Sequence, residues 1–497
     1  MKKHILTLIV FSSGALVMIL ELLASRLFSP YLGNSLPVWS ALIAVILGAL
    51  SLGYWYGGRL ADQGANWKTF ASFFFAAAIL VLLTLLLQTR ILAFLSEVSS
   101  NIYLTSIVAA VILFGPVSMV LGFVSPYAVR LRLTQISESG QTVGNLYAWS
   151  TLGSIVGTLA AGFLLLPSLG HRQLLWLCVV ALLYLGFLAY FPDSWKKDLA
   201  ALVACIFITF WGAIIIELSK NKVNLDFDTQ YSRVIIGDKI AYQGRNVRFW
   251  QTDWKTAQSA MFIDNPIELV HEYTKFYDLF LSFKPDLKES LMLGGAAFSY
   301  PKYFLETYPD KNMDVVELDG AAVDIATEYF YLNPNHPRLN IFVADARPFL
   351  RQNDKKYGAI FFDAFSTAAS IPHQLTTVEF VQDVFDGLED DGVAIVNIIS
   401  PISGEKSQLL RALYKTYAQV FPNLYLFRVN TGFAMDKPQN IILVADKNIQ
   451  AKDKDYASLS SLSYWQNYYD EEIFFDDVPV LTDDYAPSDY YAVEMLY

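Results

Sequence analysis

The sequence predicts two structural parts: a multi-pass α-helical membrane domain and, after it, an α/β domain with a mostly parallel sheet. The first prediction rests on composition, because 54% of the 497 residues are hydrophobic and the mean hydropathy is positive. These values are too high for an ordinary soluble protein. The second rests on the alternation of strand and helix patterns from Leu291 onward, which is typical of a sheet covered by helices on both faces.

Apolar segments of the first half are long enough to cross a hydrocarbon core of about 30 Å as helices. We expect about seven spans, at residues 5–24, 36–57, 69–88, 103–127, 143–166, 173–191 and 199–218. The first segment lacks a small-residue cleavage site followed by a polar chain, so we interpret it as a span and not as a signal peptide. Gly153, Gly157 and Gly162 favour close packing between helices.

Charge and cysteine usage exclude several functions. Residues 1–219 carry 11 Lys/Arg against 7 Asp/Glu, and residues 220–497 carry 25 against 40. The acidic second half repels nucleic acid, so we expect no nucleic-acid partner. Cys178 and Cys205 both fall within apolar segments. A disulfide framework and a zinc knuckle are therefore unavailable, and we expect no metal site.

Four regions follow from these patterns. Residues 1–219 form the membrane domain, and residues 220–285 hold a polar linker, Lys220 to Asp228, and a small β-sheet subdomain. Short strands at 230–236, 246–250 and 260–264 form that subdomain, and a helix from Asn265 to Phe283 follows. Residues 286–447 form the α/β domain, and residues 448–497 form an acidic, aromatic tail.

Strands of the α/β domain are expected near residues 291–294, 313–317, 340–343, 358–362, 392–397, 424–428 and 440–444. Ligands of such sheets gather at the carboxyl ends of the strands. Four ends carry suitable groups in succession, namely Gly294 with Gly295, Glu317, Asp345 with Ala346, and Asp363. Glycines let the backbone approach a ligand, and an acid some twenty residues later suits the hydroxyls of a ribose.

With these four matches in register, residues 230–447 resemble the spermidine synthase family of class I methyltransferase-like, Rossmann-like folds. The whole chain resembles the membrane-fused spermidine synthase-like proteins of bacteria. The resemblance implies that S-adenosylmethionine or its decarboxylated form is bound as a substrate. It also implies roles for individual residues: Gly294 and Gly295 in the turn around the nucleoside, Glu317 on the ribose, Asp345 and Ala346 beside the adenine, Asp363 as the catalytic acid, and Ser366 to Pro372 as a gatekeeping loop.

Departures from the family pattern concern the amine sites. An acid that binds the ammonium of decarboxylated S-adenosylmethionine is replaced by Ala297, and a second acid of the catalytic loop by Ser366. A polyamine acceptor would be poorly held by what remains. Further candidate substrate-binding residues are Tyr231, His271, Glu272, Ser366, Asp483 and Asp484, of which the last two would supply the missing acids.

Chemically, the positive sulfur is already a good leaving group, so the protein must hold the nucleoside, align a nucleophile and accept a proton. Asp363 can orient and deprotonate an amine, and methylthioadenosine is then released. Three enzymatic outcomes remain open. They are transfer to an unusual amine acceptor, an acceptor-free lyase or cyclising reaction of S-adenosylmethionine itself, and methyl transfer.

A non-enzymatic alternative is a transporter-like protein that senses the nucleoside. The loop from Gly53 to Asp62 resembles the short loop between the second and third helices of major-facilitator transporters. Membrane lipid is an expected partner in every case. A homo-oligomer is left open.

Two arguments on orientation disagree. Lys and Arg concentrate on the N-terminal side of the predicted spans, at Lys2, Lys3, Arg59, Lys68, Arg130, Arg132, Lys196 and Lys197. This places the N-terminus in the cytoplasm and, with seven spans, the second half outside. Nucleoside substrates are made inside, which favours the cytoplasm. We expect the inner membrane of a bacterial-type cell and leave the side of the catalytic domain open.

Overall fold

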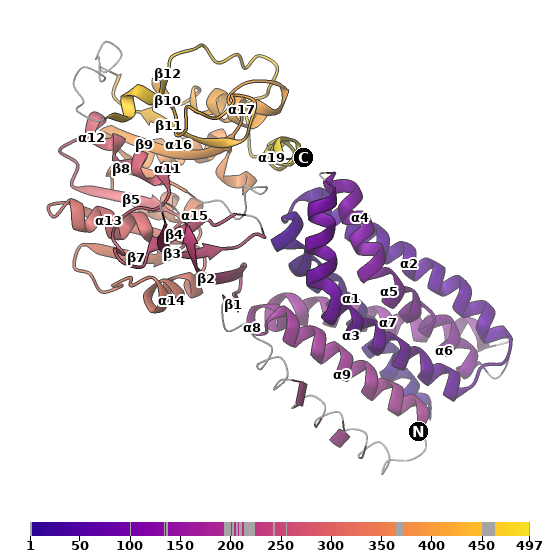
Figure 1. Ribbon diagram of the computed structural model, residues 1–497. Helices are drawn as coiled ribbons and strands as arrows, with labels where there is room; N and C mark the ends of the chain where they lie inside the picture. Colours follow the sequence, from indigo (N-terminus) through magenta and orange to yellow (C-terminus); the bar gives the residue numbers. More distant parts are fainter. Residues whose placement is uncertain are drawn as a thin grey trace. The chain divides into compact units, whose positions relative to one another are not determined.

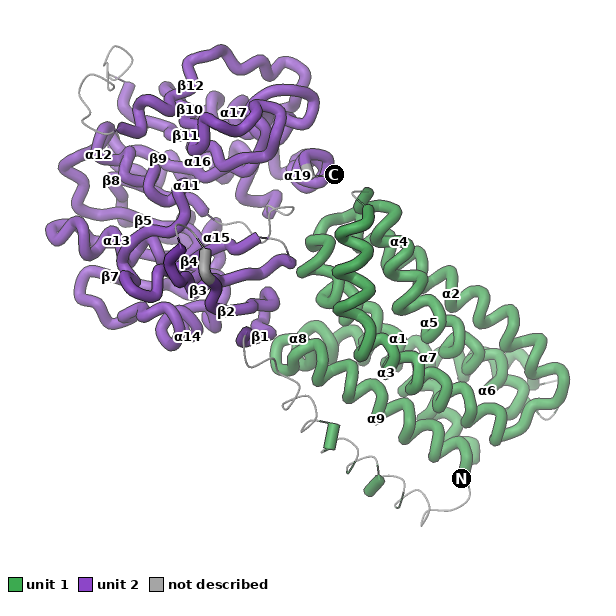
Figure 2. Tube along the Cα trace, viewed as in Figure 1, with its two compact units in different colours: residues 1–222 green, residues 223–497 purple. Residues whose placement is uncertain are grey.

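The chain forms two compact units, Met1–Lys222 and Val223–Tyr497 (Figure 2). The computed structural model describes residues 2–99, 101–133, 138–192, 224–241, 244–254, 256–363, 372–449 and 463–496, with residue 135 and a few single residues between 200 and 212. Each unit is described by itself below.

The described part of the N-terminal unit is helical (Figure 1). Its helices are α1 (Lys2–Leu32), α2 (Leu36–Asp62), α3 (Trp67–Val98), α4 (Ile102–Leu113), α5 (Gly115–Gly122), α6 (Val124–Arg132), α7 (Ser139–Ala160), the π-turn η2 (Ala161–Leu165), α8 (Leu166–Ser168) and α9 (His171–Tyr190).

Within the described residues, five helical segments are long and apolar enough to cross a membrane. They are Lys2–Leu32, Leu36–Asp62, Trp67–Val98, Ser139–Ser168 and His171–Tyr190. The span expected at residues 103–127 is instead a helix pair, Ile102–Leu113 and Gly115–Arg132, bent by 50°. Pro116 lies directly after the break, and a proline removes a helical hydrogen bond and bends the chain. The seventh expected span, 199–218, lies mostly outside the described residues.

Small residues set the distance between α1 and α7. A Cβ atom added at Gly153 would lie 1.9 Å from the Phe11 carbonyl oxygen, and one added at Gly157 would lie 2.4 Å from that of Ala15. Glycine is therefore required at both positions, as expected for closely packed membrane helices. Gly162 differs from the expectation, because a Cβ atom there would meet nothing within 4 Å.

A small antiparallel sheet opens the second unit, with the order β1 (Asn224–Asp228), β2 (Arg233–Ala241), β3 (Arg245–Gln251) and β4 (Ser259–Phe262). Strand β1 occupies the end of the expected linker, because residues 224–228 pair with residues 233–237 of β2. Val234, Ile236 and Trp250 of this sheet pack with Ala322 and Ile325 of the following domain. The small sheet is therefore attached to the larger domain through a shared core.

The large sheet has the order β12-β10-β11-β9-β8-β5-β6-β7. Its strands are β5 (Glu289–Leu293), β6 (Asn312–Glu317), β7 (Leu339–Val343), β8 (Tyr357–Phe362), β9 (Leu388–Ser400), β10 (Asn423–Arg428), β11 (Gln439–Asp446) and β12 (Tyr468–Tyr469). Strands β5 to β9 run parallel, and β11 runs antiparallel to both β9 and β10. The predicted fold class, with its mostly parallel sheet and a small β-sheet before it, is confirmed.

Successive side chains of a strand point to opposite faces of the sheet. Both faces of this sheet are apolar and are covered by helices. Leu291 and Leu293 belong to one buried cluster and Met292 to the other. The helical segments are α11 (Glu272–Lys275), η3 (Phe276–Leu279), α12 (Phe280–Phe283), α13 (Ser299–Thr307), α14 (Gly320–Tyr329), α15 (Ala346–Gln352), η4 (His373–Leu375), α16 (Val378–Gly387), η5 (Glu405–Ser407), α17 (Gln408–Tyr417), η7 (Ser463–Asn467) and α19 (Ser488–Leu496).

The single helix expected from Asn265 to Phe283 is not formed as predicted. Helical structure begins only at Glu272 and runs as the three short pieces α11, η3 and α12. Leu269 instead forms an isolated antiparallel bridge with Met261, and it is buried. Apolar spacing alone does not distinguish a buried bridge from a buried helix turn.

Candidate active site

The glycine turn after β5 is held together by one carboxylate. Gly294 has φ 94°, a conformation that glycine adopts without steric cost. The backbone N–H groups of Gly295 and Ala296 donate to Glu317 Oε2 at 2.8 and 3.1 Å, and that of Asp319 donates to Glu317 Oε1 at 2.9 Å. Glu317 therefore joins the turn to the end of β6.

A cavity of about 210 Å³ lies at the carboxyl edge of the sheet. Its lining includes six of the predicted residues, namely Tyr231, Gly294, Glu317, Asp345, Ala346 and Asp363. Gly295 adjoins it through its hydrogen bond to Glu317. Four successive strand ends thus contribute to one cavity, the arrangement that the parallel sheet predicts.

Two acids of the lining also cap helices. The Asp345 carboxylate accepts a hydrogen bond from the Arg347 N–H at 3.0 Å, and the Asp319 carboxylate accepts one from the Ala321 N–H at 3.1 Å. Each cap fixes the rotation of its carboxylate at a helix N-terminus. The cavity therefore receives carboxylates whose orientation is set by the backbone.

Asp363 directly follows β8 and is surrounded by neutral donors. The Tyr273 hydroxyl donates to Oδ2 at 2.9 Å, and Asn397 Nδ2 donates to Oδ1 at 3.0 Å. Asn397 Oδ1 in turn accepts from Asn440 Nδ2 at 2.9 Å. Burial raises the pKa of Asp363, while hydrogen bonds from Asn397 and Tyr273 and a polar contact from Tyr277 lower it less than burial raises it. The residue is thus an oriented carboxylate with an elevated proton affinity.

Tyr273 and Asn397 are functional candidates that our sequence interpretation missed. Asn397 stands within the apolar run Val393 to Ile399, and a lone amide in a buried strand needs a hydrogen-bond partner. That signal was available in the sequence. The partner of Tyr273 was not, because it lies 90 residues away.

The small sheet supplies a second group of missed residues. Trp250 of β3 lines the cavity together with four residues from the turns between the strands, Tyr231, Ser232, Thr252 and Gln258. Their side chains are polar or aromatic and uncharged. Short strands separated by turns gave no indication of which side chains would face the ligand.

Four of the expected substrate-binding residues lie outside the cavity lining, and the first two are His271 and Glu272. His271 is half-buried, its ring stacks on that of Tyr273 with the ring centroids 5.8 Å apart, and desolvation together with Lys239 lowers its pKa to about 4. It is therefore neutral at pH 7. Glu272 pairs with Lys275 at 2.7 Å on the exposed side of α11.

The expectation that Asp483 and Asp484 replace the missing acids does not agree with their positions. Asp483 forms an ion pair with Arg347, whose two terminal nitrogens each donate to its carboxylate at 2.7 Å. Asp484 is exposed. Neither belongs to the cavity lining. Ser366 and most of the expected gatekeeping loop lie outside the described residues.

Strand order sets the class of the domain. The parallel strands have the order β9-β8-β5-β6-β7, and the sheet continues beyond β9 with the antiparallel strand β11 and then β10. This strand order is that of a class I methyltransferase-like domain. Comparison with known proteins narrows this class, because residues 270–453 match the family described as spermine/spermidine synthase domain. The C-terminal unit carries a spermidine synthase domain, and the apolar N-terminal helices are compatible with a membrane-fused arrangement.

Curated relatives include two polyamine aminopropyltransferases. That of Vibrio vulnificus is 33% identical over 152 residues, which cover 30% of this chain and 48% of the relative. That of Lachnospira eligens is 30% identical over 145 residues, which cover 29% of this chain and 50% of the relative. The chain thus spans about half the length of these relatives.

Among solved structures, a probable spermidine synthase from Corynebacterium glutamicum aligns with a TM-score of 0.41 and 21% identity, over 48% of this chain and 86% of that one. Human methyltransferase-like protein 13 in complex with SAH aligns with a TM-score of 0.34 and 22% identity, over 43% of this chain and 100% of that one.

Proposed function

We propose that the C-terminal unit binds S-adenosylmethionine or its decarboxylated form and catalyses attack on the carbon next to the sulfonium, with release of methylthioadenosine. The observation that carries this proposal is the single cavity lined by Glu317, Asp345 and Asp363. The spermidine synthase domain supports it, since the curated relatives are aminopropyltransferases.

The geometry supports the roles that we propose for these residues. Glu317, held by three backbone N–H groups, faces the ribose, and Asp345 with Ala346 lies beside the adenine. Asp363 accepts the proton of the attacking amine, while Tyr273 and Asn397 keep its two oxygens in place. A new bond forms between the nucleophile and the carbon, the carbon–sulfur bond breaks, and its electron pair neutralises the sulfur. Positioning and proton transfer are the main contributions that such a reaction requires.

Charge around the reacting group argues for an unusual acceptor. Ala297 is fully buried in an apolar cluster with Val234 and Trp250. The segment after Asp363, residues 364–371, has no ionisable side chain in its sequence, and the lining from the small sheet is uncharged. Among the described acids of the lining, we assign Glu317 and Asp345 to the nucleoside and Asp363 to the reacting amine. A diamine together with decarboxylated S-adenosylmethionine would bring several positive charges to this end, and a buried charge without a partner is costly.

The same observation favours a second candidate, an acceptor-free reaction of intact S-adenosylmethionine. Its amino-acid end is a zwitterion, so the sulfonium alone needs a counter-charge, and Asp363 provides one. Attack by its own carboxylate oxygen or amine on the carbon next to sulfur closes a ring and releases methylthioadenosine. The amine route transfers one proton to Asp363, and the carboxylate route transfers none.

Purified full-length protein in detergent, incubated with either nucleoside and with or without putrescine, tests both candidates. Methylthioadenosine formed only with an amine supports transfer, and methylthioadenosine formed without one supports cyclisation. S-adenosylhomocysteine would instead indicate methyl transfer. Binding without turnover would indicate a sensor or transporter.

Asp363→Asn should abolish methylthioadenosine formation and largely retain nucleoside binding. Asp354→Asn changes an exposed acid and is the matched control. Normal turnover by the Asp363 variant would refute the role that we assign to this residue.

We propose that the C-terminal unit faces the cytoplasm. The described residues hold five long apolar helices and one bent pair, and six spans, with the pair counted as one, return the chain to the side of its N-terminus. The charge bias and the supply of nucleoside both support the cytoplasm. Labelling of single cysteines introduced at exposed positions such as Asp354, in intact and in permeabilised cells, distinguishes the two sides.

A further inference from the structure

The C-terminal segment 478–496 is an integral part of the α/β core. It lies beyond residues 270–453, which match the family. Val478 and Leu481 are buried, as are Tyr491 and Ala492 of α19, and all four belong to the cluster that contains Leu375. Its removal would therefore expose the core next to the cavity, since Leu375 also lines that cavity.

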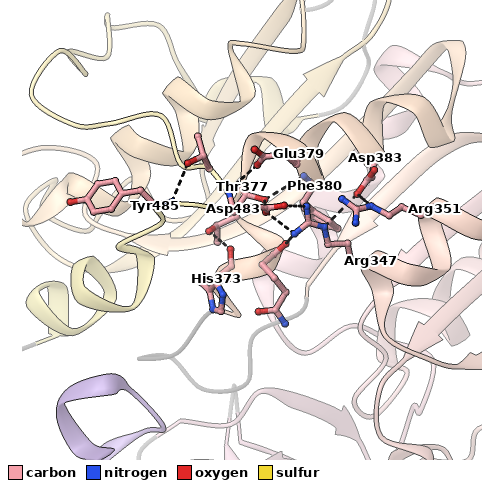
Figure 3. Close-up of polar contacts among 12 residues, drawn as sticks. Arg347, Arg351, His373, Thr377, Glu379, Phe380, Asp383, Asp483 and Tyr485 are labelled. Carbon is pink, nitrogen blue, oxygen red and sulfur yellow. Dashed lines mark hydrogen bonds and ion pairs between the residues drawn. The ribbon is translucent and has the colours of Figure 1, made fainter. Parts of the chain in front are cut away.

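Arg347 connects this segment to the cavity wall (Figure 3). The residue follows Asp345 and Ala346, which line the cavity. Its two terminal nitrogens donate to the two carboxylate oxygens of Asp483, each at 2.7 Å, and Nη1 also donates to the Gln374 carbonyl oxygen at 3.3 Å. The Arg347 side chain is only 10% exposed. One guanidinium thus joins two parts of the cavity wall to the C-terminal segment.

Asp483 is held from a second direction as well. The Thr377 hydroxyl donates to its carboxylate at 2.8 Å, and its own N–H donates to Glu379 Oε2 at 3.0 Å. The Val378 N–H donates to the Leu481 carbonyl oxygen at 2.8 Å. These contacts tie the start of α16 to the C-terminal segment directly after Gln374 and Leu375.

We infer that the Arg347–Asp483 ion pair positions the wall of the nucleoside cavity formed by Asp345, Ala346, Gln374 and Leu375. Both residues are positioning residues, because neither lines the cavity. Loss of Asp483 leaves the nearly buried Arg347 guanidinium with the more distant Asp383, 3.5 Å from its Nε, as the remaining carboxylate. This change favours a rearrangement of the segments that Arg347 connects. The identity of the ligand rests on the proposed function, whereas the positioning role of the Arg347–Asp483 ion pair does not.

Asp483→Asn and Asp484→Asn form a matched pair, because the second residue is adjacent and exposed. Affinity of the full-length protein for methylthioadenosine, measured by calorimetry in detergent, should fall by about 2- to 30-fold for Asp483→Asn. It should be unchanged for Asp484→Asn. Asp483→Glu, which keeps the charge, should retain more of the affinity than Asp483→Asn.

Hydrogen–deuterium exchange without nucleoside provides a second readout. Peptides covering residues 345–352 and 373–379 should exchange faster in Asp483→Asn, while peptides covering β6 and α14 should not change. Unchanged exchange in the first two peptides, or an equal increase in every peptide, would overturn the inference. If the wild-type protein binds no nucleoside, the proposed function fails. Hydrogen–deuterium exchange still tests whether the Arg347–Asp483 ion pair positions the cavity wall.

Discussion

Replacement of Tyr273 by Phe tests the proposed role of Asp363 with a small change. The substitution removes only the hydroxyl, which donates to Asp363 Oδ2 at 2.9 Å. Asn397 continues to donate to the other oxygen at 3.0 Å. Because Tyr273 stabilises the ionised carboxylate, its loss must raise the pKa of Asp363 further above the usual value.

The size of this change follows from the strength of the lost bond. A hydrogen bond to a charged group contributes about 1.5 to 3 kcal/mol, and 1.36 kcal/mol corresponds to one pKa unit. We therefore expect the ionised form of Asp363 to be disfavoured by about 10- to 100-fold in Tyr273→Phe, so that its pKa rises further. The Tyr273 hydroxyl does not itself ionise in the accessible range, since burial raises its pKa well above 10.

The assay is the pH dependence of kcat/KM for methylthioadenosine formation. Asp363 must be ionised to accept a proton, so activity falls below its pKa, and the acidic limb of the profile should move to higher pH in Tyr273→Phe. Removal of the other donor, by Asn397→Leu, should move it in the same direction. Tyr277→Phe should give a smaller shift, because the Tyr277 hydroxyl makes no hydrogen bond of normal geometry within the described residues.

An acidic limb that stays in place in Tyr273→Phe, or moves to lower pH, would refute the reasoning. Methylthioadenosine affinity measured on the same preparation should be unchanged within error. This control separates an effect on Asp363 from general damage to the cavity.

Two further predictions concern Glu317 and the apolar N-terminal helices. Glu317→Gln places an amide among three backbone N–H donors, so nucleoside affinity should fall about 10- to 100-fold, as measured by calorimetry, whereas Glu306→Gln, at an exposed position, should have no effect. Gly157→Ala brings a Cβ atom within 2.4 Å of the Ala15 carbonyl oxygen and should cost about 1 to 3 kcal/mol of stability. Gly144→Ala, in the same helix but with open space around it, should not lower the unfolding temperature in detergent, and equal unfolding temperatures for the two variants would contradict the packing argument.

Positions of the strands could be predicted from the sequence because their patterns are local. The Val-, Ile- and Leu-rich runs ending at Leu293, Glu317 and Phe362 are short, apolar and bounded by turn residues. Parallel strands bring their carboxyl ends to one edge, so Glu317, Asp345 and Asp363 could be predicted to share a site before any contact was known.

Local patterns were insufficient where the partner is distant. Apolar spacing from residue 265 indicated a helix, whereas Leu269 bridges to Met261. Asp483 and Asp484 were expected to supply the negative charge that the amine site lacks. Asp483 instead accepts hydrogen bonds from Arg347, which lies 136 residues earlier in the chain.

The sequence by itself thus determined the order of the strands along the chain and the acids that end them, since burial and periodicity act over a few residues. Only the tertiary structure decided which neutral side chains hold Asp363 and which cation occupies Asp483. Hydrogen bonds and ion pairs act over about 3 Å, and their partners are chosen by packing between segments that the sequence keeps far apart.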